Sequence, residues 1–309
     1  MQGGVFSCIS AKGVHEALKM NEVHEPESAA TVARPWLFYT IAYDPPGITG
    51  ARQLAKMLAG SVVRNFWPGE VLVLVNAPYP IFQVPRAGLR EEYIETPEMS
   101  AAELAALAQA AKAEAGTIFK GTDYEWVMFA DADCLCLRGL EHLLRERPEA
   151  DILYQPVPGR GAWEVEYAAY LTEEETGPRE LGTKGLPASR CGITAGVWAV
   201  RGDIYTAVMQ EWGRIQLTDP LRPGGRREQG AWNKLIRDAA QHGWRAKAFE
   251  PREIAHPLVE SGGWKLYRDA ALLHATGGTE AERQEFLFGH YLQRYFYDPA
   301  LTLLNVLET

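Results

Sequence analysis

The chain has 309 residues, of which 47% are hydrophobic and 23% charged, and its net charge is −9. This length and composition suit a globular α/β protein with a buried core, and they speak against a nucleic-acid-binding protein, because phosphate contacts need clustered Lys and Arg. The sequence has no apolar run of the roughly 18 residues that a membrane-spanning helix needs and no secretion signal, so we expect a cytoplasmic protein with no transmembrane segment.

Strands and helices alternate through the first half of the chain. Residues 1–34 show weak periodicity, and we expect a peripheral N-terminal arm there, followed by a single domain over residues 35–309. The predicted elements are a strand over 36–43, a helix over 50–66, a buried strand over 70–76, a helix from the capping box Ser100–Glu103 to about Phe119, a buried strand over 126–130, a short helix over 139–147 and a strand over 151–157. This alternation predicts the α/β class, with a mostly parallel central sheet flanked by helices.

The second half of the chain begins with residues 158–190, which are rich in Gly, Pro and charge and predict a long excursion. The elements predicted after it are a strand over 192–200, a helix from Asp203, a helix over 228–241, strands over 244–249 and 271–275, and a final helix over 279–295. The four cysteines form no CxxC pair, so we expect reduced thiols, with Cys134 and Cys136 as small apolar residues of the core.

Two carboxylates directly follow a buried strand. Residues 126–130 run into Asp131-Ala132-Asp133, and residues i and i+2 of an extended segment project to the same side. The two carboxylates repel each other unless a cation joins them, and hard oxygen ligands select Mg²⁺ or Mn²⁺, which also bridge a diphosphate. Such a tripeptide also occurs as a solvated turn, so its position at a strand end, where ligands of parallel sheets bind, is the stronger indication of a metal site.

Another apolar strand, residues 271–275, carries His274 near its end and is followed by Gly277 and Gly278. A single histidine is more often a hydrogen-bonded structural residue, but a neutral imidazole is also a common metal ligand. Glycines after it would let backbone amides approach a phosphate. We therefore expect His274 to be the third metal ligand.

Glu228 and Gln229 begin the helix predicted over 228–241. A glutamate in the first turn is favoured by the helix dipole, so helix stabilisation is one interpretation of Glu228. The apolar stripe of this helix begins only at Ala231, and we therefore expect both side chains to be exposed. The other interpretation is a catalytic pair, because the helix start would face the strand-end cleft.

These motifs resemble glycosyltransferases of the GT-A fold, in particular the retaining hexosyltransferases of the glycogenin and lipopolysaccharide-galactosyltransferase kind and related nucleotide-diphospho-sugar transferases. The resemblance covers roughly residues 35–290. The matching segments, in the family's order, are YEWVMFADADCLCLRGLEHLL, TAGVWAVRGD, REQGAWNKLI and LLHATGG.

The resemblance implies a metal-dependent transfer of a hexosyl group from a nucleotide-diphosphate sugar, a UDP-sugar, to a glycan, lipid or small-molecule hydroxyl with retention. It implies Mn²⁺ (or Mg²⁺) as cofactor. The implied roles are Asp131, Asp133 and His274 at the metal, with Asp131 also at the ribose; Thr40, Ala42 and Tyr43 at the base and ribose; Gly277 at the phosphates; Thr194, Ala195 and Gly196 at the donor sugar; and Glu228 and Gln229 near the anomeric carbon.

The sequence departs from the family at two positions. Thr194 stands where the family has Asn, and no Lys follows Gly277 at the family's spacing. Two alternatives stay open: a non-catalytic nucleotide-sugar-binding protein on a degenerate transferase fold, and an Asp-x-Asp phosphatase, although in such phosphatases the motif usually closes the first strand. An inverting reaction would need a carboxylate base beside the acceptor hydroxyl, for which Glu228 is the candidate.

Overall fold

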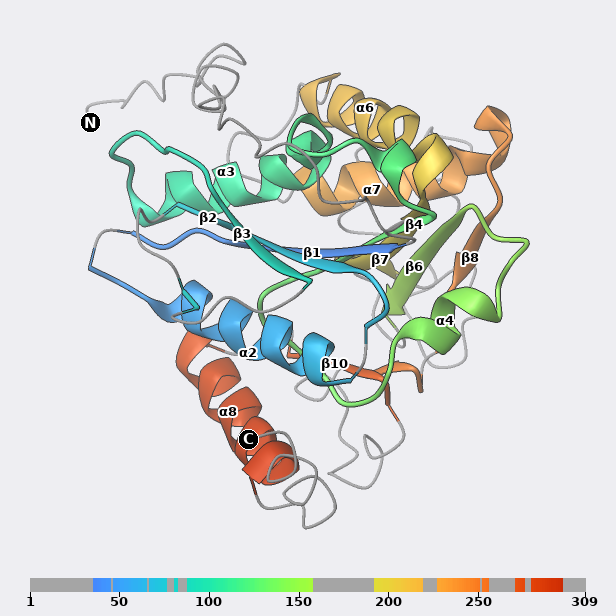
Figure 1. The fold of residues 1–309 in the computed structure, drawn as a ribbon. Helices are drawn as coiled ribbons and strands as arrows, with labels where there is room; N and C mark the ends of the chain where they lie inside the picture. Colours follow the sequence, from blue (N-terminus) through green and yellow to red (C-terminus); the bar gives the residue numbers. More distant parts are fainter. Residues whose placement is uncertain are drawn as a thin grey trace, which may run out of the picture.

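Seven strands form the central sheet of the computed structural model, in the order β3-β2-β1-β4-β7-β6-β8 (Figure 1). The structure describes residues 36–45, 47–65, 67–76, 81–82, 88–157, 192–218, 227–250, 252–255, 270–275 and 279–296. The strands of the sheet are β1 (Trp36–Ala42), β2 (Glu70–Val75), β3 (Leu89–Tyr93), β4 (Trp126–Ala130), β6 (Ile152–Val157), β7 (Gly192–Arg201) and β8 (Ala246–Ala248).

The first four strands along one side of the sheet are parallel. β1 pairs in parallel with β2 and with β4, and β2 pairs in parallel with β3. β7 is antiparallel to both of its neighbours, β4 and β6, while β6 and β8 are parallel. The predicted α/β class with a mostly parallel central sheet is therefore confirmed, and the carboxyl ends of β1 and β4 lie at the same edge.

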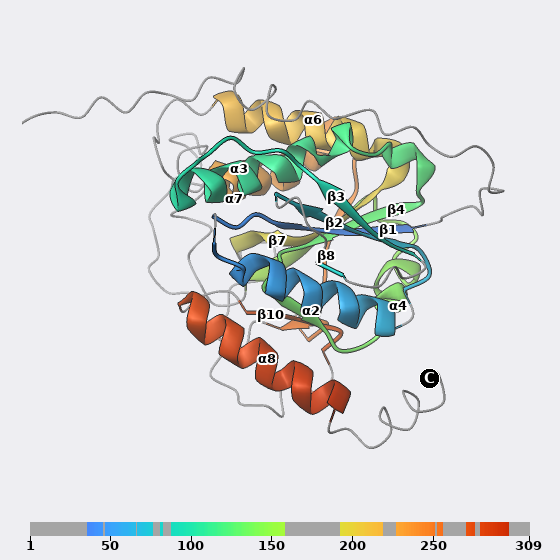
Figure 2. The same cartoon turned by 60° about the vertical axis from the view of Figure 1, so that its left-hand side comes forward.

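Helices cover both faces of this sheet. In Figures 1 and 2, α3, α6 and α7 lie over one face, and α2 and α4 lie under the other. The strands supply alternating side chains to two apolar cores: Leu37 and Tyr39 pack toward the α3, α6 and α7 side, and Phe38 packs toward α2. The helices are α2 (Gly50–Arg64), α3 (Ala101–Glu114), α4 (Glu141–Arg145), α6 (Gly202–Thr218), α7 (Arg227–Asp238) and α8 (Glu280–Phe296).

A small second sheet lies beneath α2 in Figure 2 and has the order β5-β10-β9. Its strands are β5 (Cys134–Cys136), β9 (Ile254–Ala255) and β10 (Leu272–His274). β5 and β10 are antiparallel, and His274 is registered with Cys134. Helix α8 packs on this sheet through Leu287. The chain therefore passes from β4 into β5 through Asp131–Asp133, directly beside the end of β10.

The predicted strands and helices within the described residues are present, with ends shifted by a few residues. β3 is a strand that the sequence pattern does not predict, because LREEY is a partly exposed edge strand without an apolar run. Cys134 and Cys136 are free and buried, as expected. The predicted arm over 1–34 and the excursion over 158–190 lie outside the described residues. None of the helices in the described part of the chain combines the length and apolar composition that crossing a bilayer requires.

Candidate functional site

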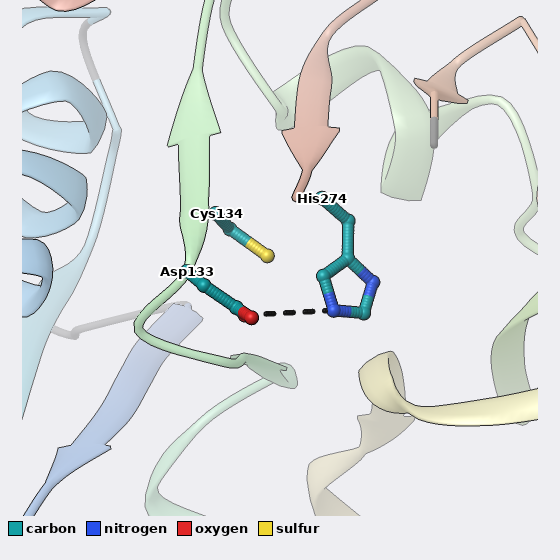
Figure 3. Close-up of side chains that lie close together, drawn as sticks. All are labelled: Asp133, Cys134 and His274. Carbon is teal, nitrogen blue, oxygen red and sulfur yellow. Dashed lines mark ion pairs between the residues drawn. The ribbon is translucent and has the colours of Figure 1, made fainter. Parts of the chain in front are cut away.

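Three of the predicted ligands meet at the carboxyl edge of the sheet. Asp131 and Asp133 lie in the turn between β4 and β5, and His274 is the last residue of β10. The Nε2 atom of His274 is 3.6 Å from Oδ1 of Asp133 (Figure 3) and 3.9 Å from Oδ2 of Asp131. Backbone hydrogen bonds hold these segments together, since Ala275 N donates to Asp133 O at 2.9 Å and Asp131 N donates to Gly196 O at 2.7 Å.

A hydrogen bond at Nδ1, the ring nitrogen that does not face the aspartates, orients the imidazole of His274. Its Nδ1 atom lies 2.8 Å from Oε1 of Gln155, a buried side chain on β6. Because Oε1 accepts, Nδ1 carries the ring hydrogen and Nε2 is left as an acceptor when the ring is neutral. Burial lowers the pKa of His274 to about 4, so the ring is neutral at pH 7. Its lone pair therefore points toward two carboxylates.

Asp133 completes a group of acceptor atoms that converge at this edge. Burial, and next the charge of Asp131, raise the pKa of Asp133 to about 7. Its Oδ1 atom is buried and has no hydrogen-bond partner among the described residues. The side chains of Asp131 and Asp133 keep 31% and 20% of their exposure, so an ion can reach them from solvent. Converging acceptors with solvent access fit a cation.

The donor set also indicates which cation fits. The potential ligand atoms of Asp133, Cys134 and His274 lie within 4.8 Å of one another (Figure 3). Burial, and next the charge of Asp133, raise the pKa of the Cys134 thiol well above its usual range, and a protonated thiol is a poor ligand. Carboxylate oxygens with a neutral imidazole suit Mn²⁺ or Mg²⁺ better than a thiolate-seeking metal. Asp131, Asp133 and His274 therefore fit the predicted ion.

Lys112 of α3 is a site residue that the sequence analysis missed. Its buried ammonium lies 2.7 Å from Oδ1 of Asp131, forms an ion pair with Glu228 and sits 5.0 Å from the centre of the Phe129 ring. Burial by itself lowers the pKa of Lys112, but the two carboxylates raise it above its usual range. The sequence does contain an indication of this role. Leu104, Ala108 and Lys112 are spaced four residues apart and so lie on one face of the helix, where Lys112 places a charge in a row of buried or partly buried apolar residues.

Glu228 corrects one expectation. The sequence predicts an exposed carboxylate in the first turn of its helix, but Glu228 is only 7% exposed. The buried face of the helix starts one turn earlier than predicted: Lys112 pairs with the Glu228 carboxylate, and Trp212 Nε1 donates to the Glu228 carbonyl at 3.1 Å. Gln229 is half-buried, and its carbonyl accepts a hydrogen bond of 2.7 Å from Asn233. The expectation of an exposed Glu228 is therefore wrong.

Gly196 of β7 lies against the acceptor group. A Cβ atom built there would be 2.3 Å from Cε1 of His274 and 2.7 Å from Oδ2 of Asp131, distances that no side chain can occupy. Thr194 and Ala195 are buried beside it; Thr194 Oγ1 accepts from Gly196 N at 3.0 Å, and Ala195 O is 3.5 Å from Nζ of Lys112. The predicted donor-sugar segment thus contacts the candidate metal ligands.

Arg283 brings a second cation from α8. Its Nε atom is 3.4 Å from Oδ2 of Asp133, and its side chain keeps 28% of its exposure. No sequence pattern singles out Arg283, because Arg on a helix surface is usually solvated. Lys112 and Arg283 therefore approach the two aspartates from opposite layers of the fold.

The predicted base and ribose residues lie at the end of β1. Thr40 and Ala42 are fully buried, and Tyr43 is nearly so. The hydroxyls of Thr40 and Tyr43 are buried without a hydrogen-bond partner among the described residues. Burial, and next the charge of Glu114, raise the pKa of Tyr43 above its usual range. Gly277, predicted at the phosphates, lies outside the described residues.

No family model matches this sequence, and no curated protein matches it. The solved structures to which the chain is similar include the crystal structure of a glycosyltransferase involved in the glycosylation of the major capsid of PBCV-1. The identity is 13%, the match covers 82% of this chain and 100% of that chain, and the TM-score is 0.49.

Proposed function

We propose that this chain is a metal-dependent glycosyltransferase that moves a hexosyl group from a UDP-sugar to an acceptor hydroxyl with retention, and that residues 35–309 form its single domain. The observation that supports this most is the convergence of Asp131, Asp133 and His274 at the carboxyl edge of a mostly parallel sheet. Ligands of open α/β sheets bind at that edge.

Asp131, Asp133 and His274 would hold Mn²⁺ or Mg²⁺. When bound, the ion supplies positive charge that stabilises the diphosphate leaving group. We assign Arg283 to the same diphosphate, because the chain lacks the lysine expected after Gly277 and Arg283 brings a partly exposed guanidinium to Asp133. An arginine recognises phosphate oxygens through two parallel hydrogen bonds.

Lys112 and Glu228 would act on the donor sugar. The carboxylate of Glu228 is buried and held in an ion pair by the ammonium of Lys112. A carboxylate that is already paired in this way suits the stabilisation of positive charge at the anomeric carbon better than it suits deprotonation of an acceptor. This contact favours retention over inversion.

The proposal is tested with the wild-type protein and a panel of nucleotide-sugars in the presence and absence of Mn²⁺. We expect a UDP-sugar to raise the melting temperature only with the metal ion, and slow release of UDP in the absence of acceptor. Stabilisation without any UDP release would support the binding-protein alternative instead. Release of inorganic phosphate from phosphomonoesters, without nucleotide-sugar binding, would support the phosphatase alternative.

A further inference from the structure

Gln155 occupies an irregular place in the central sheet. β6 and β7 pair Tyr154 with Trp198 and then Gln155 with Thr194, so that three residues of β7 have no partner on β6. The unpaired stretch contains Gly196. A bulge bends the strand that carries the extra residues and redirects the side chains around it. Here the irregularity brings Gln155 and Gly196 to the same imidazole.

The two residues contact different atoms of the His274 ring. Gln155 is fully buried, and its Oε1 is 2.8 Å from Nδ1 of His274, across 119 residues of sequence. A Cβ at Gly196 would lie 2.3 Å from Cε1 and 2.8 Å from Nε2 of the ring. The ring is therefore close against the backbone at Cε1 and Nε2 and is hydrogen-bonded to an acceptor at Nδ1.

The hydrogen bond to Gln155 decides which ring nitrogen carries the hydrogen. Without an acceptor at Nδ1, the hydrogen would be more stable on Nε2, where it would donate to Asp133 Oδ1 or Asp131 Oδ2, 3.6 and 3.9 Å away. That tautomer leaves no lone pair at the position that faces the carboxylates. A ligating histidine needs the opposite tautomer, which an acceptor behind the ring supplies.

We infer that Gln155 is a positioning residue for metal binding, which fixes the tautomer and the ring orientation of His274 before an ion arrives. The inference rests on the proposed function, since it assigns a role to Gln155 only through His274. A side chain at position 155 can fill this role only if it places an acceptor atom where Oε1 of Gln155 lies, within hydrogen-bond distance of Nδ1 of His274.

The experiment compares Gln155→Leu, which removes the acceptor, Gln155→Asn, which withdraws it by one methylene, and Gln155→Glu, which keeps it. Calorimetry measures Mn²⁺ affinity, and ¹⁵N NMR of the imidazole reports the tautomer in metal-free protein. We expect Leu and Asn to weaken Mn²⁺ binding about 10–100-fold and to move the hydrogen to Nε2, while Glu retains binding and the Nδ1–H tautomer.

Two outcomes separate this inference from the proposed function. If Gln155→Leu, or Gln155→Asn should Leu not fold, keeps the wild-type tautomer and affinity, Gln155 is a structural residue and the inference is overturned. If even the wild-type protein does not bind Mn²⁺, the metal-dependent function fails. The tautomer measured by NMR then still decides whether Gln155 orients His274.

Discussion

Both edges of the central sheet carry charged side chains, but they arrange them differently. At the amino edge, Glu125 accepts hydrogen bonds from Trp36 Nε1 at 3.1 Å and from Arg201 Nη1 at 3.0 Å. Glu70 is paired with Arg90, and it accepts from the hydroxyl of Tyr124 at 2.9 Å. Each of these two carboxylates is therefore paired with donors of the fold, and the pairs connect neighbouring segments at this edge.

The carboxyl edge also has cations, since Lys112 pairs with Asp131 and Arg283 lies 3.4 Å from Oδ2 of Asp133. It nevertheless brings acceptor atoms against one another, because the Nε2 atom of His274 faces carboxylate oxygens of both aspartates. A hollow of about 270 Å³ exists at the amino edge, lined in part by Glu125, Arg145 and Arg201, but these groups already pair within the fold. A hollow or a charge alone therefore does not indicate a ligand site, and the acceptor atoms that face one another at the carboxyl edge are the stronger indication.

The largest expected effect comes from Asp133→Asn. This variant should abolish turnover and Mn²⁺-dependent nucleotide binding, since it removes a ligand that the other groups cannot replace. At pH 8 without metal it should melt at a higher temperature than the wild type, because a buried carboxylate with a raised pKa is charged there at a cost. Glu70→Gln is the matched control at the amino edge, where we expect lower stability and normal turnover. Unchanged Mn²⁺–nucleotide affinity in Asp133→Asn would falsify the metal assignment.

A double-mutant cycle on Lys112 and Glu228 has the next largest effect. Lys112→Met leaves the buried Glu228 and the partly exposed Asp131 without their common cation and should cost about 3–5 kcal/mol of stability. Glu228→Gln should lower turnover by at least about 10²-fold. The double variant should regain part of the stability lost in Lys112→Met, but none of the turnover. Additive losses in denaturant unfolding would mean that the ion pair is not energetically coupled.

Gly196→Ala tests the close approach of β7. Its Cβ would meet His274 and Asp131 at distances that require both side chains to shift, so we expect Mn²⁺ affinity to fall by about 10-fold or more. Gly213→Ala on α6 is the control, because its Cβ would make only an ordinary contact of 4.0 Å with Ala113. That variant should be stabilised by about 0.5–1 kcal/mol with unchanged metal binding. Equal affinities in the two variants would remove Gly196 from the site.

The smallest effect is a pH dependence of stability in metal-free protein, in which two groups oppose each other. The pKa of Asp133 is raised from 3.8 to about 7, so its contribution to stability is present below pH 3.8 and is lost as the pH rises toward 7. The pKa of His274 is lowered from 6.5 to about 4, so its contribution is present above pH 6.5 and is lost as the pH falls toward 4. The two contributions nearly cancel in the wild type between pH 4 and 6.5.

Single substitutions should reveal each contribution. In denaturant titrations with EDTA, we expect Asp133→Asn to become more stable relative to the wild type as the pH rises from 4 to 7. We expect His274→Gln to become less stable relative to the wild type as the pH rises from 4 to 6.5. The variant lacks the stability that His274 gains over this range and keeps only the stability that Asp133 loses. If both differences stay flat across this range, the two groups do not titrate as the fold implies.

Much of the fold could be predicted from the sequence, and so could the aspartates and His274. Buried strands such as β4 are near-continuous apolar runs, and a polar residue directly after such a run marks the sheet edge where ligands bind. Asp131 stands in that position, Asp133 follows two residues later, and His274 ends the short apolar strand β10. Local pattern and strand polarity therefore carry enough information to select the candidate metal ligands.

The supporting residues could not be predicted in the same way. Gln155 lies within a strand, and its contact with His274 depends on an irregular β6–β7 register that no local pattern encodes. Arg283 reaches Asp133 only because α8 packs on the small sheet. Lys112 did leave a signal, a charge on a buried helical stripe, but the abundance of alanine in α3 makes that stripe hard to locate.

The wide spacing of the site along the chain has a consequence for the newly made protein. Gln155 and His274 are separated by 119 residues, and Arg283 lies later still. A nascent chain that ends before β10 contains Asp131 and Asp133 but lacks His274, the third candidate ligand. Contacts between segments that are distant in sequence also form slowly during folding. A metal ion that binds only the assembled site stabilises finished molecules and leaves truncated ones unaided.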